Sequence, residues 1–171
     1  MTRPGEPSGE GTGGAGGAGG AGGAGGPRRM IPVGAQPAAS GEALPVVNIY
    51  DAVGGQGFFD ELVERFYRGV ASDVVLRPLY PDDLRDSKRH LALFLGQYWG
   101  GPGTYSEARG HPRLRMRHAP FAVGEPQRDA WLRHMSAALD SLVVERHIHP
   151  VVEARMLEYF TMTADAMINT R

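Results

Sequence analysis

Residues 109–121 read RGHPRLRMRHAPF. Arginines occupy every second position at Arg113, Arg115 and Arg117, and His118 follows them directly. An imidazole in this setting offers one nitrogen to a metal, and the cations beside it favour an anion. None of the other histidines in the chain has a comparable setting. The sequence therefore predicts that His118 is a nitrogen ligand beside an anion site.

The segment around this stretch, from Gly100 to Gly124, is rich in glycine, proline and arginine and has little helical periodicity. A loop of this length is uncommon in a compact domain unless it is functional or is supported by something besides its own core. A bound cofactor would supply that support.

Four segments on either side of this loop repeat apolar residues with the period of amphipathic helices. The first begins after Gly54-Gly55, a pair that permits a tight turn, and continues to about Val70. The others are expected from about Leu84 to Trp99, from near Pro126 through Leu142, and from near Pro150 through Met167. No stretch alternates with period two over a useful length. The sequence therefore predicts an all-α domain.

Composition restricts the class of protein. A chain of 171 residues with 42% hydrophobic residues predicts one domain with a real core. A net charge of -1 argues against a general polyanion binder, so no nucleic acid partner is expected. The absence of cysteine excludes disulfides, thiolate nucleophiles and Cys-based metal sites. Because no apolar run is long enough to span a membrane, we expect a soluble, cytoplasmic protein.

The first part of the chain has a different composition. Gly-Gly-Ala triplets repeat between Gly13 and Gly26, and a Pro-rich, apolar-poor segment follows. Such a sequence cannot bury enough apolar surface to fold, so residues 1–45 are expected to form a disordered tail. The tail is a flexible linker, a tether for a partner, or a segment without function. The folded domain is expected over residues 46–171.

An iron porphyrin requires a neutral imidazole for the iron, an apolar slot for the ring, and cations near its two propionates. His118 can supply the first, the aromatic helix faces the second, and the arginines from Arg113 to Arg117 the third. Each feature alone has an ordinary explanation. The histidine could cap a helix, the apolar helix faces could be plain core, and the arginines could lie on a solvated surface. Their convergence in one segment predicts a haem site.

Several motifs occur in a fixed order along the part of the chain that is expected to fold. They are YDAVGG at 50–55, RFY at 65–67, LYP at 79–81, QYWGGP at 97–102, YSE at 105–107, the 109–121 stretch, and RDAW at 128–131. Through these motifs the chain resembles the truncated haemoglobins, specifically group II, the O-type, over roughly residues 49–169. The resemblance implies a truncated globin fold, a two-over-two helical sandwich in which the segment before His118 is largely irregular. It also implies haem b (iron protoporphyrin IX) as the cofactor.

The resemblance assigns roles to individual residues. It implies that His118 is the proximal ligand of the haem iron. It places Tyr67, Tyr80 and Trp131 at the distal polar positions, where their side chains would donate hydrogen bonds to a ligand on the iron.

Three further positions are assigned on the distal side. Leu91 falls at the apolar position over the iron, and Ser87 at the distal gate, where a small residue leaves the entrance open. His90 falls where related proteins often carry an arginine that reaches a propionate, so the chain departs from the family pattern at this salt link. The other residues expected to contact the haem are Phe94, Tyr105, His111, Arg113, Met116, Arg117 and Phe121.

The resemblance and the distal donors together predict reversible binding of dioxygen, with nitric oxide, carbon monoxide and peroxide as further ligands. Firm retention of a negatively charged ligand favours redox chemistry, such as nitric oxide oxidation or peroxide reduction, over oxygen delivery. The sequence contains no flavin or nicotinamide fingerprint, so the reductant would come from an external reductase.

Two other functions stay open at this point. One is an oxygen store, carrier or sensor with the same haem site and no turnover. The other is a haem-free helical interaction domain that uses the arginine run to bind an acidic partner or nucleic acid. His147 and His149 could hold a surface metal, but two ligands make a weak site, and capping or solvent exposure explains them better. The apolar content of the last helix is compatible with a homodimer.

Overall fold

The computed structural model describes residues 48–170, and the tail predicted at residues 1–45 lies outside them. The described part contains helices and connecting turns and no strand, which confirms the all-α prediction. The elements are α1 (Ile49–Ala52), α2 (Gln56–Ser72), the 3-10 helix η1 (Arg77–Leu79), α3 (Arg85–Tyr98), α4 (Thr104–Arg109), α5 (Leu114–His118), α6 (Glu125–Arg146) and α7 (Pro150–Met167).

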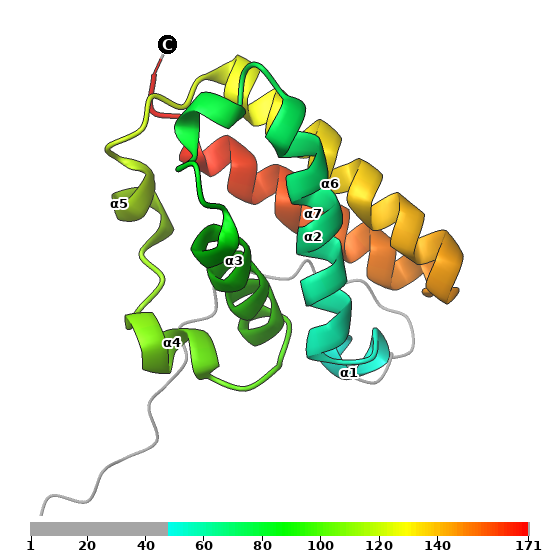
Figure 1. Cartoon of the computed structure of the whole chain (residues 1–171). Helices are drawn as coiled ribbons and strands as arrows, with labels where there is room; N and C mark the ends of the chain where they lie inside the picture. Colours follow the sequence, from blue (N-terminus) through cyan, green and yellow to red (C-terminus); the bar gives the residue numbers. More distant parts are fainter. Residues whose placement is uncertain (1–47, 171) are drawn as a thin grey trace, which may run out of the picture. The chain divides into compact units, whose positions relative to one another are not determined.

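The long helices form two pairs. Helix α2 packs against α3 and α6, and α6 packs against α7, as Figure 1 shows. The pairs α2–α3 and α6–α7 give the predicted two-over-two sandwich. The short helix α4 contacts α3, and α5 contacts α7. None of the described helices is long and apolar enough to cross a membrane.

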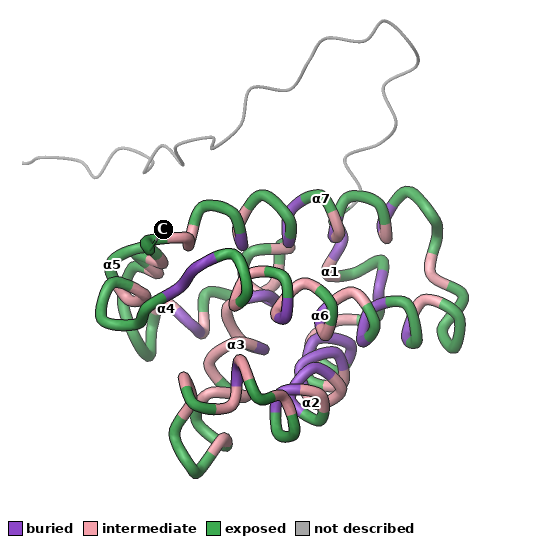
Figure 2. The backbone as a smooth tube through the Cα atoms, turned by 90° about the horizontal axis from the view of Figure 1, so that it is seen from above, coloured by how far each residue is buried: buried purple, intermediate pink, exposed green. Residues whose placement is uncertain are grey.

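The core lies between the inward faces of these helices, and α2 contributes most to it. In Figure 2 buried positions recur along α2 and along one side of α6 and α7. The spacing of three and four residues places these α2 side chains on one face. The buried residues of α2 are Phe58, Phe59, Leu62, Val63, Phe66, Tyr67 and Val70.

The four predicted long helices are confirmed, but the sequence did not predict three short ones. Helices α4 and α5 lie in the loop between Gly100 and Gly124, and α1 precedes the first glycine pair. Each is shorter than two turns, so no apolar period can develop in its sequence. The left-handed backbone of Gly110 and Arg113 ends α4 and starts α5, which keeps the segment before His118 from forming one continuous helix.

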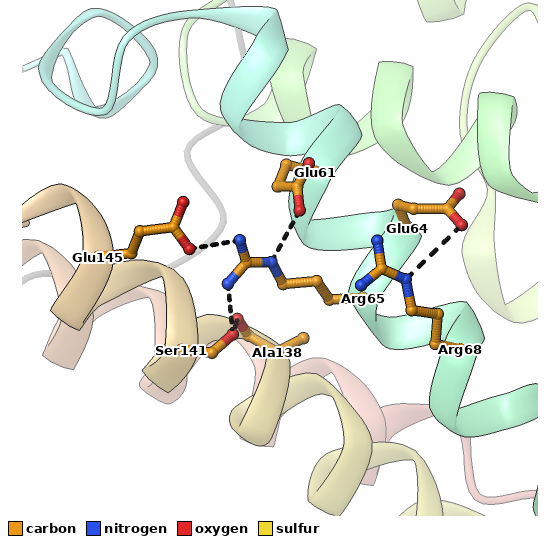
Figure 3. Close-up of polar contacts among 7 residues, drawn as sticks. All are labelled: Glu61, Glu64, Arg65, Arg68, Ala138, Ser141 and Glu145. Atoms are coloured by element: carbon orange, nitrogen blue, oxygen red, sulfur yellow. Dashed lines mark hydrogen bonds and ion pairs between the residues drawn. The ribbon is translucent and has the colours of Figure 1, made fainter.

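A polar cluster around Arg65 joins the two helix pairs (Figure 3). The Arg65 guanidinium donates to Glu61 at 2.8 Å within α2 and reaches across to Ser141 at 2.9 Å and Glu145 at 2.6 Å on α6. Its planar fork can hold several oxygens at once, which a lysine ammonium in the same place could not do with this geometry. Arg65 therefore fixes the position of α6 along α2.

The turn after α2 is organised by Asp73. One carboxylate oxygen accepts from the backbone N–H groups of Val75 and Leu76 at 2.8 and 2.9 Å. The other lies 2.7 Å from both His134 Nε2 and Arg133 on α6. This carboxylate thereby fixes the start of η1, the turn that leads to Tyr80.

Asp73 makes the stability of the protein depend on acid pH. The hydrogen bond from His134 and those from the backbone hold the pKa of this carboxyl well below its ordinary value of 3.8. A depressed pKa in the folded state means that the ionised group stabilises the fold above the ordinary value. The stabilisation is lost as pH falls through the lowered pKa.

We therefore expect Asp73→Asn to unfold at a lower urea concentration than the parent near neutral pH. The difference between the two urea midpoints should narrow as pH falls below about 3.8. Urea midpoints of both proteins at neutral and acid pH measure this. Asp140→Asn, at an exposed position of α6, is the matched control. Its urea midpoint should differ from that of the parent by the same small amount at neutral and acid pH. An Asp73→Asn gap that is equal at both pH values would contradict the expectation.

Candidate functional site

A cavity of about 360 Å³ lies among α3, α6, α7 and the segment that carries α5. This volume falls in the range of sites for small molecules and cofactors, about 300 to 1,000 Å³. The cavity brings together eleven of the fourteen predicted site residues. They are Tyr67, Tyr80, Ser87, His90, Leu91, Phe94, Tyr105, Arg117, His118, Phe121 and Trp131.

The other three, His111, Arg113 and Met116, do not line the cavity. The imidazole of His111 accepts from the Arg113 backbone N–H at 3.3 Å, and Arg113 begins α5 with φ 43°. Met116 is 67% exposed. In this structure the three shape and flank the turn before His118, and contact with a cofactor stays a prediction for them.

His118 is the last residue of α5, and one of its ring nitrogens has a partner. Nδ1 lies 2.8 Å from the carbonyl oxygen of Leu114, one helical turn earlier. A carbonyl only accepts, so Nδ1 carries the hydrogen, and in the neutral imidazole the lone pair is on Nε2. A hydrogen bond of this kind fixes the tautomer and orientation of a metal-binding histidine. His118 is thus arranged to offer Nε2 to a metal.

Arg117 braces the loop before this histidine. Its Nε donates to the Pro112 carbonyl at 2.8 Å, and its NH2 donates to the Arg109 carbonyl at 2.9 Å. The guanidinium also lines the cavity. Arg117 therefore holds the loop in place while bringing a positive charge to the cavity wall.

Asn169, near the end of the described chain, holds the other side of His118. Its side-chain nitrogen donates to the carbonyls of His118 and Phe121 at 3.2 and 3.0 Å, and its side-chain oxygen accepts from Val123 at 3.0 Å. The sequence did not predict this residue. Nothing local marks an asparagine 51 residues beyond its partner.

The three residues that the sequence predicts as distal donors all line the cavity: Tyr67 lies on α2, Tyr80 on the turn after η1 and Trp131 on α6. The rings of Tyr67 and Tyr80 meet edge to face with centroids 5.4 Å apart. Burial raises the pKa of Tyr67, with a further contribution from the Tyr80 hydroxyl, and burial raises the pKa of Tyr80 to about 12. Both phenols therefore keep their hydrogen at physiological pH and remain donors.

Arg77 fixes the turn that carries Tyr80. Its NH1 donates to the carbonyls of Tyr80 and Pro81 at 3.0 and 3.2 Å. Like Asn169, this arginine acts on backbone oxygens, and its role has no signature in the sequence.

His90 lines the cavity beside a second cation, Arg109, that the sequence did not predict for the site. Arg109 NH1 lies 3.0 and 3.1 Å from the two ring nitrogens of His90. Burial lowers the pKa of His90, and the charge of Arg109 lowers it further, so the imidazole is favoured in its neutral form. Arg109, at the end of α4, also lines the cavity. The positive charge beside His90 therefore comes from Arg109 on α4 and not from residue 90 on α3.

The cavity fits an iron porphyrin on three independent observations. The Nε2 of His118 is free to ligate, the lining is largely apolar through residues such as Leu91 and Phe94, and Arg109 and Arg117 can pair with propionates. Two helix pairs around such a cavity define a haem-binding globin.

The chain belongs to the bacterial-like globin family, whose model matches residues 48–169. It is 40% identical over 120 residues to a group 2 truncated hemoglobin of Bacillus subtilis (strain 168), covering 70% of this chain and 87% of that protein. It is also similar to the solved structure of a thermostable hemoglobin from Thermobifida fusca. The identity is 52% and the TM-score 0.67, with 71% of this chain and 96% of the other covered. For a truncated oxygen-avid haemoglobin from Bacillus subtilis the identity is 37% and the TM-score 0.65, with 71% and 98% covered.

Membership of this family confirms the truncated haemoglobin resemblance, haem b as the cofactor and oxygen binding as the function. It decides against the haem-free interaction domain. His147 and His149 have structural roles, since His147 ends α6 in a left-handed conformation and His149 caps α7 by accepting from the Val151 N–H at 3.2 Å. Residues 48–170 contain no group of three side chains that could hold a metal ion by themselves.

Proposed function

We propose that this globin holds dioxygen with high affinity, releases it slowly, and supports redox chemistry of oxygen with nitric oxide or of peroxide. The observation that carries the proposal is the set of three donors, Tyr67, Tyr80 and Trp131, in one largely apolar cavity. An indole N–H can only donate, and the two phenols stay protonated because burial raises each pKa. These three donors would stabilise, through hydrogen bonds, a ligand that gains negative charge when it binds.

The haem, when bound, supplies the iron that takes up dioxygen, nitric oxide, carbon monoxide or peroxide. His118 would hold that iron through Nε2, and Leu91 and Phe94 keep the cavity apolar. Ser87 lines the cavity with a small side chain, which leaves room for a ligand to enter.

The strength of the donors indicates the size of the effect. A hydrogen bond to a charged group contributes about 1.5 to 3 kcal/mol, so two such bonds contribute about 3 to 6 kcal/mol. At about 1.4 kcal/mol per factor of ten, release slows by about a hundredfold to ten-thousandfold if the rate of entry is unchanged. A protein that releases oxygen this slowly is poorly suited to deliver it.

Turnover would need an electron donor from outside the chain, and an external reductase is the proposed source. The alternative is an oxygen store, carrier or sensor that has the same cavity but no turnover. The similarity to a structure described as oxygen-avid supports slow release in either case.

A nitric oxide assay separates the two functions. When the oxygenated protein is mixed with nitric oxide, we expect one nitrate for each bound oxygen. With a reductase and its electron source present, nitrate should continue to accumulate, because the reduced protein is restored after each cycle. The carbon monoxide form of the same protein is the control and should give no nitrate. Bound oxygen that survives exposure to nitric oxide, together with peroxide that is not consumed, would favour the store or sensor.

A further inference from the structure

We propose that the stacked pair Tyr159–Tyr98 conducts electrons between the cavity and the protein surface, and that Tyr98 is a surface site where small phenolic donors are oxidised. The proposal rests on the peroxide part of the proposed function. It gives the protein a second place of reaction, because a donor at Tyr98 would not enter the cavity.

The pair connects two helices that are distant in sequence. Tyr159 lies on α7, lines the cavity and is 7% exposed. Tyr98 is the last residue of α3 and is 48% exposed. Their rings stack with centroids 3.9 Å apart and planes at 24°. One stacked contact therefore spans the distance from the cavity wall to solvent.

Further aromatic rings extend this contact on both sides. Trp99 packs against Tyr159 and Tyr98, with ring centroids at 5.3 and 5.0 Å. On the inner side Phe160 lies 6.0 Å from Tyr159 and 5.9 Å from Trp131. The chain of rings thus begins at a distal donor of the cavity and ends at the exposed phenol.

The surroundings of the two phenols suit one-electron oxidation. A phenol that loses an electron also loses its hydrogen, so it needs a nearby acceptor. Tyr98 is open to water, which can take that proton. Burial raises the pKa of Tyr159, and the partly exposed hydroxyl of Thr163 beside it can relay the phenolic proton toward water by accepting it while releasing its own, and return it in the same way. Tyr159 can therefore pass an electron inward while Tyr98 releases its proton to solvent.

In the cavity one hydrogen peroxide takes two electrons and two protons, its O–O bond breaks, and two waters form. Tyr98 supplies the electrons one at a time and gives its phenolic proton to water at each step. Each tyrosyl radical then takes one hydrogen atom from a phenolic donor, so two donors become two phenoxyl radicals per peroxide.

A first experiment uses the haem-loaded protein, hydrogen peroxide, guaiacol and a spin trap. We expect trap adducts at Tyr98 by mass spectrometry. Guaiacol oxidation should fall by about tenfold in Tyr98→Phe and in Tyr159→Phe, which corresponds to about 1.4 kcal/mol of barrier. Tyr50→Phe, which changes a tyrosine stacked on Phe59 away from the cavity lining, is the matched control and should match the parent.

A second experiment tests the path without peroxide. Zinc protoporphyrin replaces haem and is oxidised by a light flash in the presence of an electron acceptor. The path predicts a tyrosyl radical that disappears in Tyr98→Phe and persists in Tyr50→Phe. An unchanged radical in Tyr98→Phe would overturn the path, whether or not the protein consumes peroxide. If the radical forms at Tyr98 but the parent with haem does not consume peroxide, the path holds and the peroxide part of the proposed function fails.

Discussion

Tyr67→Phe is expected to release bound dioxygen about tenfold to a hundredfold faster than the parent protein, because it removes one hydrogen bond worth about 1.5 to 3 kcal/mol. The ring is 3% exposed, so phenylalanine keeps the packing and removes only the O–H. Its edge-to-face contact with Tyr80 at 5.4 Å should also persist. The change therefore isolates the donor from the shape of the cavity.

Stopped-flow displacement of oxygen by carbon monoxide measures the rate. Trp131→Phe should act in the same direction, because it removes the indole N–H from the cavity wall. Tyr50→Phe is the control, since Tyr50 does not line the cavity. Release from Tyr67→Phe and Trp131→Phe at the parent rate would remove the basis for slow release.

Phe66→Ala is expected to lower the free energy of unfolding by about 3 to 5 kcal/mol. Phe66 is fully buried on α2, and its ring lies 5.0 Å from that of Tyr67 and 5.5 Å from that of Trp131. Truncation would leave a void directly behind two of the distal donors. Since a domain of this size has a total stability of about 5 to 15 kcal/mol, the loss is a large fraction.

Urea unfolding of the haem-loaded protein, followed by circular dichroism, measures this loss. Val144→Ala on α6 removes apolar atoms from a side chain that is 77% exposed, and it should change stability by less than about 0.5 kcal/mol. A Phe66→Ala protein as stable as this control would mean that the ring does not support the core.

The long helices could be predicted because each buries an apolar face that recurs through several turns. The periodicity in residues 58–70 identifies the buried face of α2 directly. Helices α4 and α5 have only six and five residues, and α5 buries none of them, so no comparable pattern exists in their sequence. Their position depends on contacts with α3 and α7 instead.

The sequence could predict which side chains line the cavity where chemistry requires a particular group, as at His118, Tyr67, Tyr80 and Trp131. The groups that position those side chains were not. Asp73, Arg77 and Asn169 act through backbone atoms or through partners on other helices, and such pairings leave no local pattern. Arg109 belonged to the 109–121 stretch, but only the folded chain brings it beside His90.

We propose that His118 offers its Nε2 to the haem iron while the Leu114 carbonyl holds Nδ1. Resonance Raman spectroscopy of the ferrous protein tests it most directly, through the iron–histidine stretch. In His118→Gly loaded with haem, that band should disappear and should return when imidazole is added. An iron–histidine band of unchanged frequency in His118→Gly without imidazole would contradict the account.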